Sequence, residues 1–153
     1  MATPEDRLAE LGIALPPPPP PAAAYVPTVV SGNHLYVSGQ IPTMDGKIVA
    51  TGRLGDTLDV ADGAKAARVC AINVIAQLKG ALGDLSRVVR VVKLTGFVAS
   101  EPGFTDQPEV VNGASELLAE VFGDAGKHAR SAVGVAALPR GVPVEVEAIV
   151  EFR

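Results

Sequence analysis

Two apolar, β-prone runs near the C-terminus constrain the fold of this chain more than any other feature. Residues 129–138 and residues 144–150 are both rich in Val and Ala, and a turn that contains Pro and Gly joins them. Two such runs joined by a short turn predict a β-hairpin. Because side chains alternate along a strand, Glu145 and Glu147 share one face of the second strand, and its valines share the other.

The polar residues of this predicted hairpin permit two interpretations. Arg130 opens the first strand, and the two glutamates lie on the second. One interpretation is a half-buried edge hairpin with a solvated acidic face. The other is a site in which a planar guanidinium binds a carboxylate and a neighbouring carboxylate handles protons. The spacing alone does not decide between them.

The composition is typical of a domain with an aliphatic core. A chain of 153 residues is long enough for a single core. It is 48% hydrophobic and 20% charged, and it lacks Trp. Its net charge is -4, with Lys and Arg scattered along the chain. Nucleic-acid binding depends on phosphate contacts from clustered basic residues, so we expect no nucleic-acid partner.

The sequence predicts neither a membrane segment nor a metal site. No run approaches the ~18 apolar residues of a membrane span, and the acidic N-terminus is unlike a signal peptide, so we expect a cytoplasmic protein without a membrane partner. Cys70 is the only cysteine and lies within a helical pattern, which favours a packing role. His34 and His128 lack zinc-type spacing, so no metal is expected.

Hydrophobic periodicity predicts the order of the elements as a helix followed by ββ(β)αβαββ. Two helices with one apolar stripe each, beside a mostly antiparallel sheet, predict an α+β fold with both helices on one face. The predicted helices are residues 3–13, 59–82 and 106–122, and the predicted strands before the final hairpin are residues 25–38 (a hairpin that turns at 31–33), 47–49 and 88–99.

Six consecutive prolines occupy residues 16–21, which we call the proline segment. Such a run adopts an extended polyproline II conformation and has no backbone donors. It is either a spacer that ties the first helix to the body of the protein or a ligand for a proline-recognising module.

Two separated blocks of sequence match one known family. The first comprises Tyr25-Val26-Pro27 and residues 32–42, which end in Ser-Gly-Gln-Ile-Pro. The second runs from Arg130-Ser131 through Leu-Pro to Val-Glu-Val-Glu at residues 144–147. Together they resemble the YjgF/RidA family, also called endoribonuclease L-PSP-like, over residues 25–153. Residues 1–24 then form an N-terminal helix and polyproline extension. The resemblance implies a chorismate-mutase-like fold and a homotrimer with clefts between its subunits.

The resemblance also implies a site for a small carboxylate-bearing metabolite. Arg130 matches the family arginine that holds the carboxylate of a 2-imino or 2-enamino acid. Glu145 matches the glutamate that orients or deprotonates a water, which hydrolyses the imine to a 2-keto acid and ammonia without a cofactor. The residues that match the rest of the pocket are Tyr25, Ser38, Asn112 and, through its backbone, Ala132.

The chain departs from the family pattern at two positions beside the arginine. His128 stands where the family commonly has proline, and Ala132 stands where the deaminase branch commonly has cysteine. These differences and the extension indicate a divergent subgroup. The function that the resemblance implies is an imine/enamine deaminase. The alternatives are a protein that binds or senses keto acids on the same cleft without turnover and, third, a chaperone-like or ribonuclease role.

Overall fold

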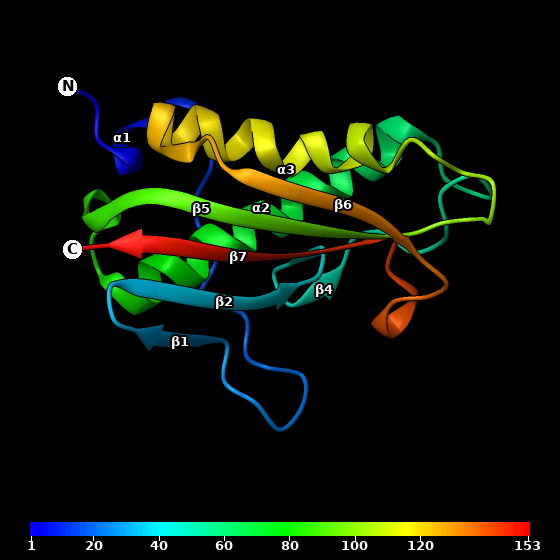
Figure 1. The fold of residues 1–153 in the computed structure, drawn as a ribbon, viewed down its shortest axis with the longest axis horizontal. Coiled ribbons are helices and arrows are strands. Elements are labelled where there is room, and N and C mark those ends of the chain that lie inside the picture. Colours follow the sequence, from blue (N-terminus) through cyan, green and yellow to red (C-terminus); the bar gives the residue numbers. More distant parts are fainter.

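A five-stranded sheet with two long helices on one face forms the body of the protein in the computed structural model, which describes residues 1–153 (Figure 1). The order across the sheet is β1-β2-β7-β5-β6, and every neighbouring pair is antiparallel except β5 and β6. The predicted α+β fold is therefore confirmed. The strands are β1 (Thr28–Ser31), β2 (His34–Gln40), β5 (Val88–Ala99), β6 (Ala129–Val135) and β7 (Val144–Phe152).

The two long helices begin and end close to the predicted residues. Helix α2 (Val60–Leu82) begins after Asp59, whose carboxylate accepts a hydrogen bond from the Asp62 backbone at 2.8 Å. It ends at Gly83, whose φ of 78° is readily available only to glycine. Helix α3 (Gln107–Phe122) packs against α2 across Gly113, where a Cβ atom would overlap the backbone carbonyl of α2. This close contact fixes the position of α3 above the sheet.

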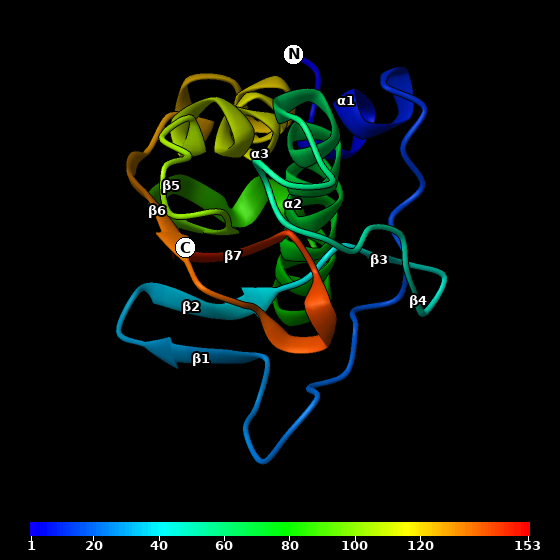
Figure 2. The same ribbon diagram turned by 90° about the vertical axis from the view of Figure 1, so that its right-hand side faces the viewer.

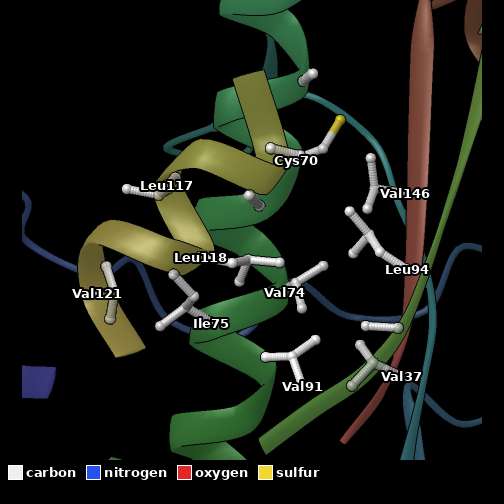
Figure 3. Close-up of a cluster of buried hydrophobic side chains, with 14 of the residues drawn as sticks. Val37, Cys70, Val74, Ile75, Val91, Leu94, Leu117, Leu118, Val121 and Val146 are labelled. Carbon is white, nitrogen blue, oxygen red and sulfur yellow. The ribbon is translucent and has the colours of Figure 1, made fainter. Parts of the chain in front are cut away.

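The core lies between these helices and the sheet and contains 27 buried residues. Figure 3 shows Val74 of α2, Leu118 of α3 and Leu94 of β5 converging in it. Cys70 is fully buried among them, as predicted. Burial of the thiolate form is unfavourable in this environment, which raises the pKa of Cys70 well above its ordinary value.

The prediction of a C-terminal hairpin is wrong, because β6 and β7 do not pair with each other. Strand β5 lies between them, parallel to β6 and antiparallel to β7. Helix α3 supplies the crossover connection that parallel neighbours need. The connection between β6 and β7 includes the 3-10 turn η3 (Pro139–Gly141) and takes the chain past β5. Pro and Gly indicate that a chain turns, but they do not determine which strands become neighbours.

The N-terminal hairpin is confirmed, with β1 and β2 joined at Gly32-Asn33. The region predicted to hold one short strand at residues 47–49 instead forms a small separate hairpin of β3 (Thr43–Met44) and β4 (Lys47–Ile48). Asp45 and Gly46 both have positive φ at its turn, a conformation typical of tight two-residue hairpins.

The N-terminal segment packs along the body of the protein (Figure 2). Helix α1 (Pro4–Glu10) is capped by Thr3, and its Leu8 is buried with 3% exposure in the main core. The proline segment then runs beside α2, where the Gln77 amide donates to the Pro19 carbonyl at 2.7 Å. The same amide donates to the Gln40 side chain at 3.3 Å and so links the proline segment to the end of β2. None of the helices has the length and apolarity needed to cross a membrane.

Candidate functional site

The sheet register determines where the predicted site residues lie. Arg130 pairs with Leu94 of β5, which is fully buried on the helix-covered face. Glu145 pairs with Phe97 of β5, three residues further along an unbroken ladder. Because side chains alternate along a strand, Arg130 and Glu145 lie on opposite faces of the sheet. The predicted site residues accordingly fall into two groups.

The first group, the Arg130 cluster, consists of Arg130 and the side chains and carbonyl of α3 that hold it. Arg130 Nη1 donates to Asn112 Oδ1 at 2.8 Å and to Ser115 Oγ at 3.2 Å, and Nη2 donates to the Pro108 carbonyl at 3.3 Å. Positions 108, 112 and 115 follow helical i, i+4 and i, i+3 spacing, so they share one face of α3. The Nε–H group and one Nη2–H group have no partner within the chain, and they are available to a carboxylate.

The second group surrounds a cavity of about 340 Å³, which we call the Glu145 pocket. Glu145 lies in its wall with Tyr25, Ser38 and Arg140, and Pro19–Pro21 close another side. Arg140 has a φ of 60°, which is uncommon for a residue other than glycine, and it has no hydrogen-bond or ion-pair partner. The pocket therefore combines one carboxylate, one unpaired guanidinium and the hydroxyl-bearing side chains of Tyr25, Ser38 and Thr43.

The Glu145 carboxylate lies directly over Gly39 of β2. A Cβ atom at Gly39 would overlap Glu145 Oε1, so only glycine leaves the carboxylate room at this place. Half-burial raises the pKa of Glu145 above its ordinary value, and the negative charge of Glu147 raises it further. A carboxylate with a raised pKa is a better base than an exposed glutamate and a better acid than water.

Ser38 and Tyr25 have a structural role in the Glu145 pocket as well as a place in its wall. The Ser38 hydroxyl donates to the Pro27 carbonyl at 3.1 Å, and the Ser38 backbone donates to the same oxygen at 2.9 Å. These bonds hold the loop that carries Tyr25, whose hydroxyl accepts from the Ala22 backbone at 3.4 Å. Tyr25 as a whole is 46% exposed, so it is accessible at the mouth of the pocket.

Ala132 belongs to neither set of contacts. It lies two residues after Arg130 on the same face of β6, and its methyl group packs partly buried against the core. Strand β6 is the edge of the sheet, so alternate backbone groups around Ala132 lack a strand partner. The expected contribution of the Ala132 backbone to the site stays a prediction.

Within one chain, the structure brings Glu145, Tyr25 and Ser38 together and brings Arg130 and Asn112 together, but it separates the two groups. Sequence reasoning missed Ser115, which follows Asn112 at helical spacing, and the pocket residues Gly39 and Arg140. The helical spacing could have indicated Ser115, because residues three apart share a face. Nothing in the local sequence indicated that Gly39 lies under Glu145, since the contact joins residues distant in the chain. No group of three or more His, Cys, Asp or Glu side chains is arranged to hold a metal.

The element order, the mixed sheet and the helices on one face define a protein of the chorismate-mutase-like class. The model of the family described as "YjgF/chorismate mutase-like, putative endoribonuclease" matches residues 5–146, and this chain belongs to that family. The resemblance to YjgF/RidA proteins is therefore confirmed. The matched range includes nearly all of α1 and the whole proline segment, while the division of the chain at residues 24 and 25 stays a prediction.

Three relatives illustrate the similarity. Protein TCP17 of Trypanosoma cruzi is 55% identical over 147 residues, which cover 95% of this chain and 92% of that protein. The crystal structure of protein Atu1372 from Agrobacterium tumefaciens is 54% identical with a TM-score of 0.91, covering 98% of this chain and 92% of that chain. The crystal structure of E. coli TdcF with bound serine is 29% identical with a TM-score of 0.61, covering 88% and 93%.

Proposed function

We propose that this protein is a 2-imino/2-enamino acid deaminase whose clefts form between the subunits of a homotrimer. The observation that carries the proposal is that one chain holds two groups, each of which is incomplete as a site by itself. Arg130 has two unpartnered N–H groups, and Glu145 is a half-buried carboxylate with a raised pKa. A second copy of the chain, which brings its Glu145 pocket to the Arg130 cluster, completes a site for a small carboxylate and a reactive water.

The sheet face opposite the helices supports assembly. This face carries the exposed apolar residues Val29, Tyr36 and Val133. Val29 pairs with Tyr36, and Tyr36 pairs with the outward-facing Ile149. Val133 pairs with the outward-facing Phe97. Val29, Tyr36 and Val133 are 51%, 45% and 42% exposed. Apolar surface gathered on one sheet face is typical of an interface between chains. A trimer would bury it and place the edge strand β6 of one subunit near its neighbour.

The proposed reaction is hydrolysis of a protonated imine. Glu145 takes a proton from water as the water oxygen attacks the imine carbon, and the C=N π electrons move to nitrogen. Glu145 then returns the proton to that nitrogen, the C–N bond breaks, and ammonia leaves. The hydroxyl oxygen forms the C=O bond and passes its proton to the departing ammonia. Arg130 binds the carboxylate throughout with its free N–H groups. In total, the protonated imino acid and one water give the keto acid and one ammonium ion.

A non-catalytic protein that binds a small keto acid is the alternative. The serine-bound TdcF structure supports binding of a small carboxylate by a relative of this chain. A binder needs the guanidinium but has no use for a base. The raised pKa of Glu145 therefore favours the deaminase.

Generation of the substrate in place provides the test. A serine dehydratase releases 2-aminoacrylate, and pyruvate formation is followed with and without this protein. We expect faster pyruvate release with the wild-type protein and none above background with Arg130→Ala. Loss of a charge-assisted contact in a sheltered cleft costs about 2–5 kcal/mol. Arg68→Ala is the matched control, because Arg68 lies on α2 in an exposed ion pair with Glu120 at 3.4 Å. Wild-type activity in Arg130→Ala would refute the proposed site.

A further inference from the structure

A chain of hydrogen bonds leads from the backbone to Arg130 through two side chains that the proposed reaction does not use. His128 Nδ1 lies 2.6 Å from the Gly126 carbonyl oxygen, and His128 Nε2 lies 2.9 Å from Ser115 Oγ. Ser115 Oγ in turn accepts from Arg130 Nη1 at 3.2 Å. His128 lies directly before β6 and Ser115 lies on α3, so this chain of bonds joins the start of β6 to α3 behind the guanidinium.

The partners determine the direction of every bond in this chain. A carbonyl oxygen only accepts, so Nδ1 of His128 carries the hydrogen that bonds Gly126. In the neutral ring Nε2 is then an acceptor, and the Ser115 hydroxyl donates to it. With its hydrogen directed at His128, Ser115 Oγ turns a lone pair toward Arg130. Neutral His128 therefore makes Ser115 a fixed acceptor.

The Ser115 oxygen determines which N–H groups of Arg130 stay free for a ligand. Ser115 and Asn112 together engage Nη1, and the Pro108 carbonyl engages Nη2. The planar guanidinium is thereby held through its two terminal nitrogens, and the Nε–H group and one Nη2–H group stay free. Loss of the Ser115 bond would leave Nη1 to be held by Asn112 alone and would allow the plane to rotate.

We propose that Ser115 and His128 are positioning residues that fix the orientation of the Arg130 guanidinium for carboxylate binding, and that protonation of His128 releases it. The proposal rests on the proposed function of Arg130. It also gives a role to His128, one of the two positions beside Arg130 at which this chain departs from the family pattern.

Protonation reverses the bond between His128 and Ser115. A protonated Nε2 donates to Ser115 Oγ, so the hydroxyl hydrogen must turn away from His128. Two cationic donors, His128 and Arg130, then share the one Ser115 oxygen. Half-burial lowers the pKa of His128 below its ordinary value, the bond to the Gly126 carbonyl opposes this shift, and the Arg130 charge adds to it. The ring is thus neutral at neutral pH.

The other charged groups on the elements around His128 either have partners within the chain or are exposed. Lys127 and Asp124 from the preceding turn pair with each other at 3.0 Å. Lys93 of the adjacent β5 bonds Ser131 at 3.2 Å, and Glu120 of α3 pairs with Arg68 at 3.4 Å. Glu116 of α3 is exposed. None of these groups shifts the pKa of His128, and Arg130 is the one charge that does.

The test measures binding of pyruvate by calorimetry across about pH 5.5–8, which keeps the pyruvate carboxylate ionised throughout. We expect Ser115→Ala to raise the Kd about tenfold at neutral pH, the effect of one bond to a charged group. Ser115→Thr, which keeps the hydroxyl, should restore binding, and Glu116→Ala is the matched control on the exposed neighbour. The wild-type Kd should rise toward acid pH more steeply than that of His128→Gln, which keeps an acceptor but does not titrate.

The variants separate this inference from the proposed function. Arg130→Ala with wild-type pyruvate binding would refute the proposed site itself. Loss of binding in Arg130→Ala together with unchanged Kd in Ser115→Ala would overturn only the positioning role. Identical pH profiles for the wild type and His128→Gln, or tighter wild-type binding at acid pH, would likewise overturn the role of His128. Thermal melting of each variant separates these effects from loss of the fold.

Discussion

Arg130 and Glu145 lie on opposite faces of one sheet, and strand β5 separates the two strands that carry them. Arg130 pairs with the buried Leu94, and Glu145 pairs with Phe97 on the other face. The side chain of Arg130 is further held toward α3 by Asn112. A single chain therefore does not offer both groups to one small ligand. A site that uses both requires two copies.

This separation predicts that two inactive variants complement each other. We expect Arg130→Ala and Glu145→Ala to be inactive alone. When they are co-expressed and assort at random into trimers, about one quarter of the clefts combine an intact Arg130 with an intact Glu145 from a neighbour. In the mixed trimers alone, isolated through a different tag on each variant, about one third of the clefts are intact because every mixed ring contains one such cleft, and their activity measures this fraction. Mixed trimers as inactive as the parents would show that the two residues do not share a cleft.

The sequence allowed prediction of the elements more readily than of their arrangement. Asp59 and Gly83 bound α2 through local capping chemistry, which depends only on nearby residues. The pairing of β5 with both β6 and β7 depends instead on contacts between distant segments, and the local turn at Pro139 gave the wrong neighbours for β6. Local sequence determines where a chain turns, whereas contacts between distant segments determine which strands become neighbours.

The candidate site shows the same division. The family resemblance, and not the local pattern, identifies Arg130, Glu145 and Asn112 as site residues, and their catalytic or binding roles stay a prediction. The contact between Arg130 and Asn112 joins a strand to a helix, so no periodicity within either element predicts it. Given Asn112, the spacing of three residues along α3 is enough to predict that Ser115 lies on the same face of the helix.

Glu145→Gln should slow the release of keto acid while pyruvate binding is retained. Glutamine keeps the shape and hydrogen bonds of the side chain but loses its basicity. For the wild type we expect turnover to fall at acid pH as the raised pKa of Glu145 is crossed, because only the carboxylate accepts a proton from water. Single-turnover measurements with 2-aminoacrylate, beside calorimetry with pyruvate, distinguish the two effects. Unchanged turnover would assign Glu145 a structural role.

The same substitution should affect stability in a pH-dependent direction. Because the folded-state pKa of Glu145 is raised, the folded protein binds more protons than the unfolded chain between the ordinary and the raised pKa. Stability from this group is present at acid pH and is lost as pH rises through the raised pKa. Glu145→Gln should therefore melt higher than the wild type at about pH 7.5, and this difference should shrink at about pH 4. A difference that grows toward acid pH would contradict the raised pKa.

Gly39→Ala should displace the Glu145 carboxylate without unfolding the protein. The added methyl group would occupy the place of Glu145 Oε1, and the end of a glutamate side chain can rotate away. We expect turnover to fall as far as in Glu145→Gln, with a melting temperature near that of the wild type. Gly103→Ala, where a Cβ meets nothing within 4 Å, is the matched control. Full activity in Gly39→Ala would show that the position of the carboxylate is unimportant.

Leu8→Ala should test whether α1 is part of the fold. Leu8 is 3% exposed and belongs to the main core, and Glu5 of the same helix bonds the Leu85 backbone at 2.8 Å. Truncation of a buried leucine costs about 2–5 kcal/mol of unfolding free energy. Leu11→Ala is the control, because Leu11 is 37% exposed. Equal denaturation midpoints for the two variants would show that α1 adds little to the stability of the body.

The proline segment should restrict the size of the substrate, because its last residues form one wall of the Glu145 pocket. Pro21 lines this pocket, whereas Pro17 lines only the neighbouring cavity beside the β3–β4 hairpin. Pro21→Ala widens and loosens the wall, so kcat/KM for the imino acid of leucine should rise relative to that of alanine by up to about tenfold, the scale of a change of one methylene in an apolar pocket. An amino-acid oxidase supplies both imino acids. Pro17→Ala loosens the same segment at a position outside the pocket wall, so it should keep the wild-type ratio of the two kcat/KM values. The same kcat/KM ratio in all three proteins would show that the wall does not contact the substrate. An equal rise of this ratio in Pro17→Ala and Pro21→Ala would assign the effect to the stiffness of the segment rather than to the shape of the pocket.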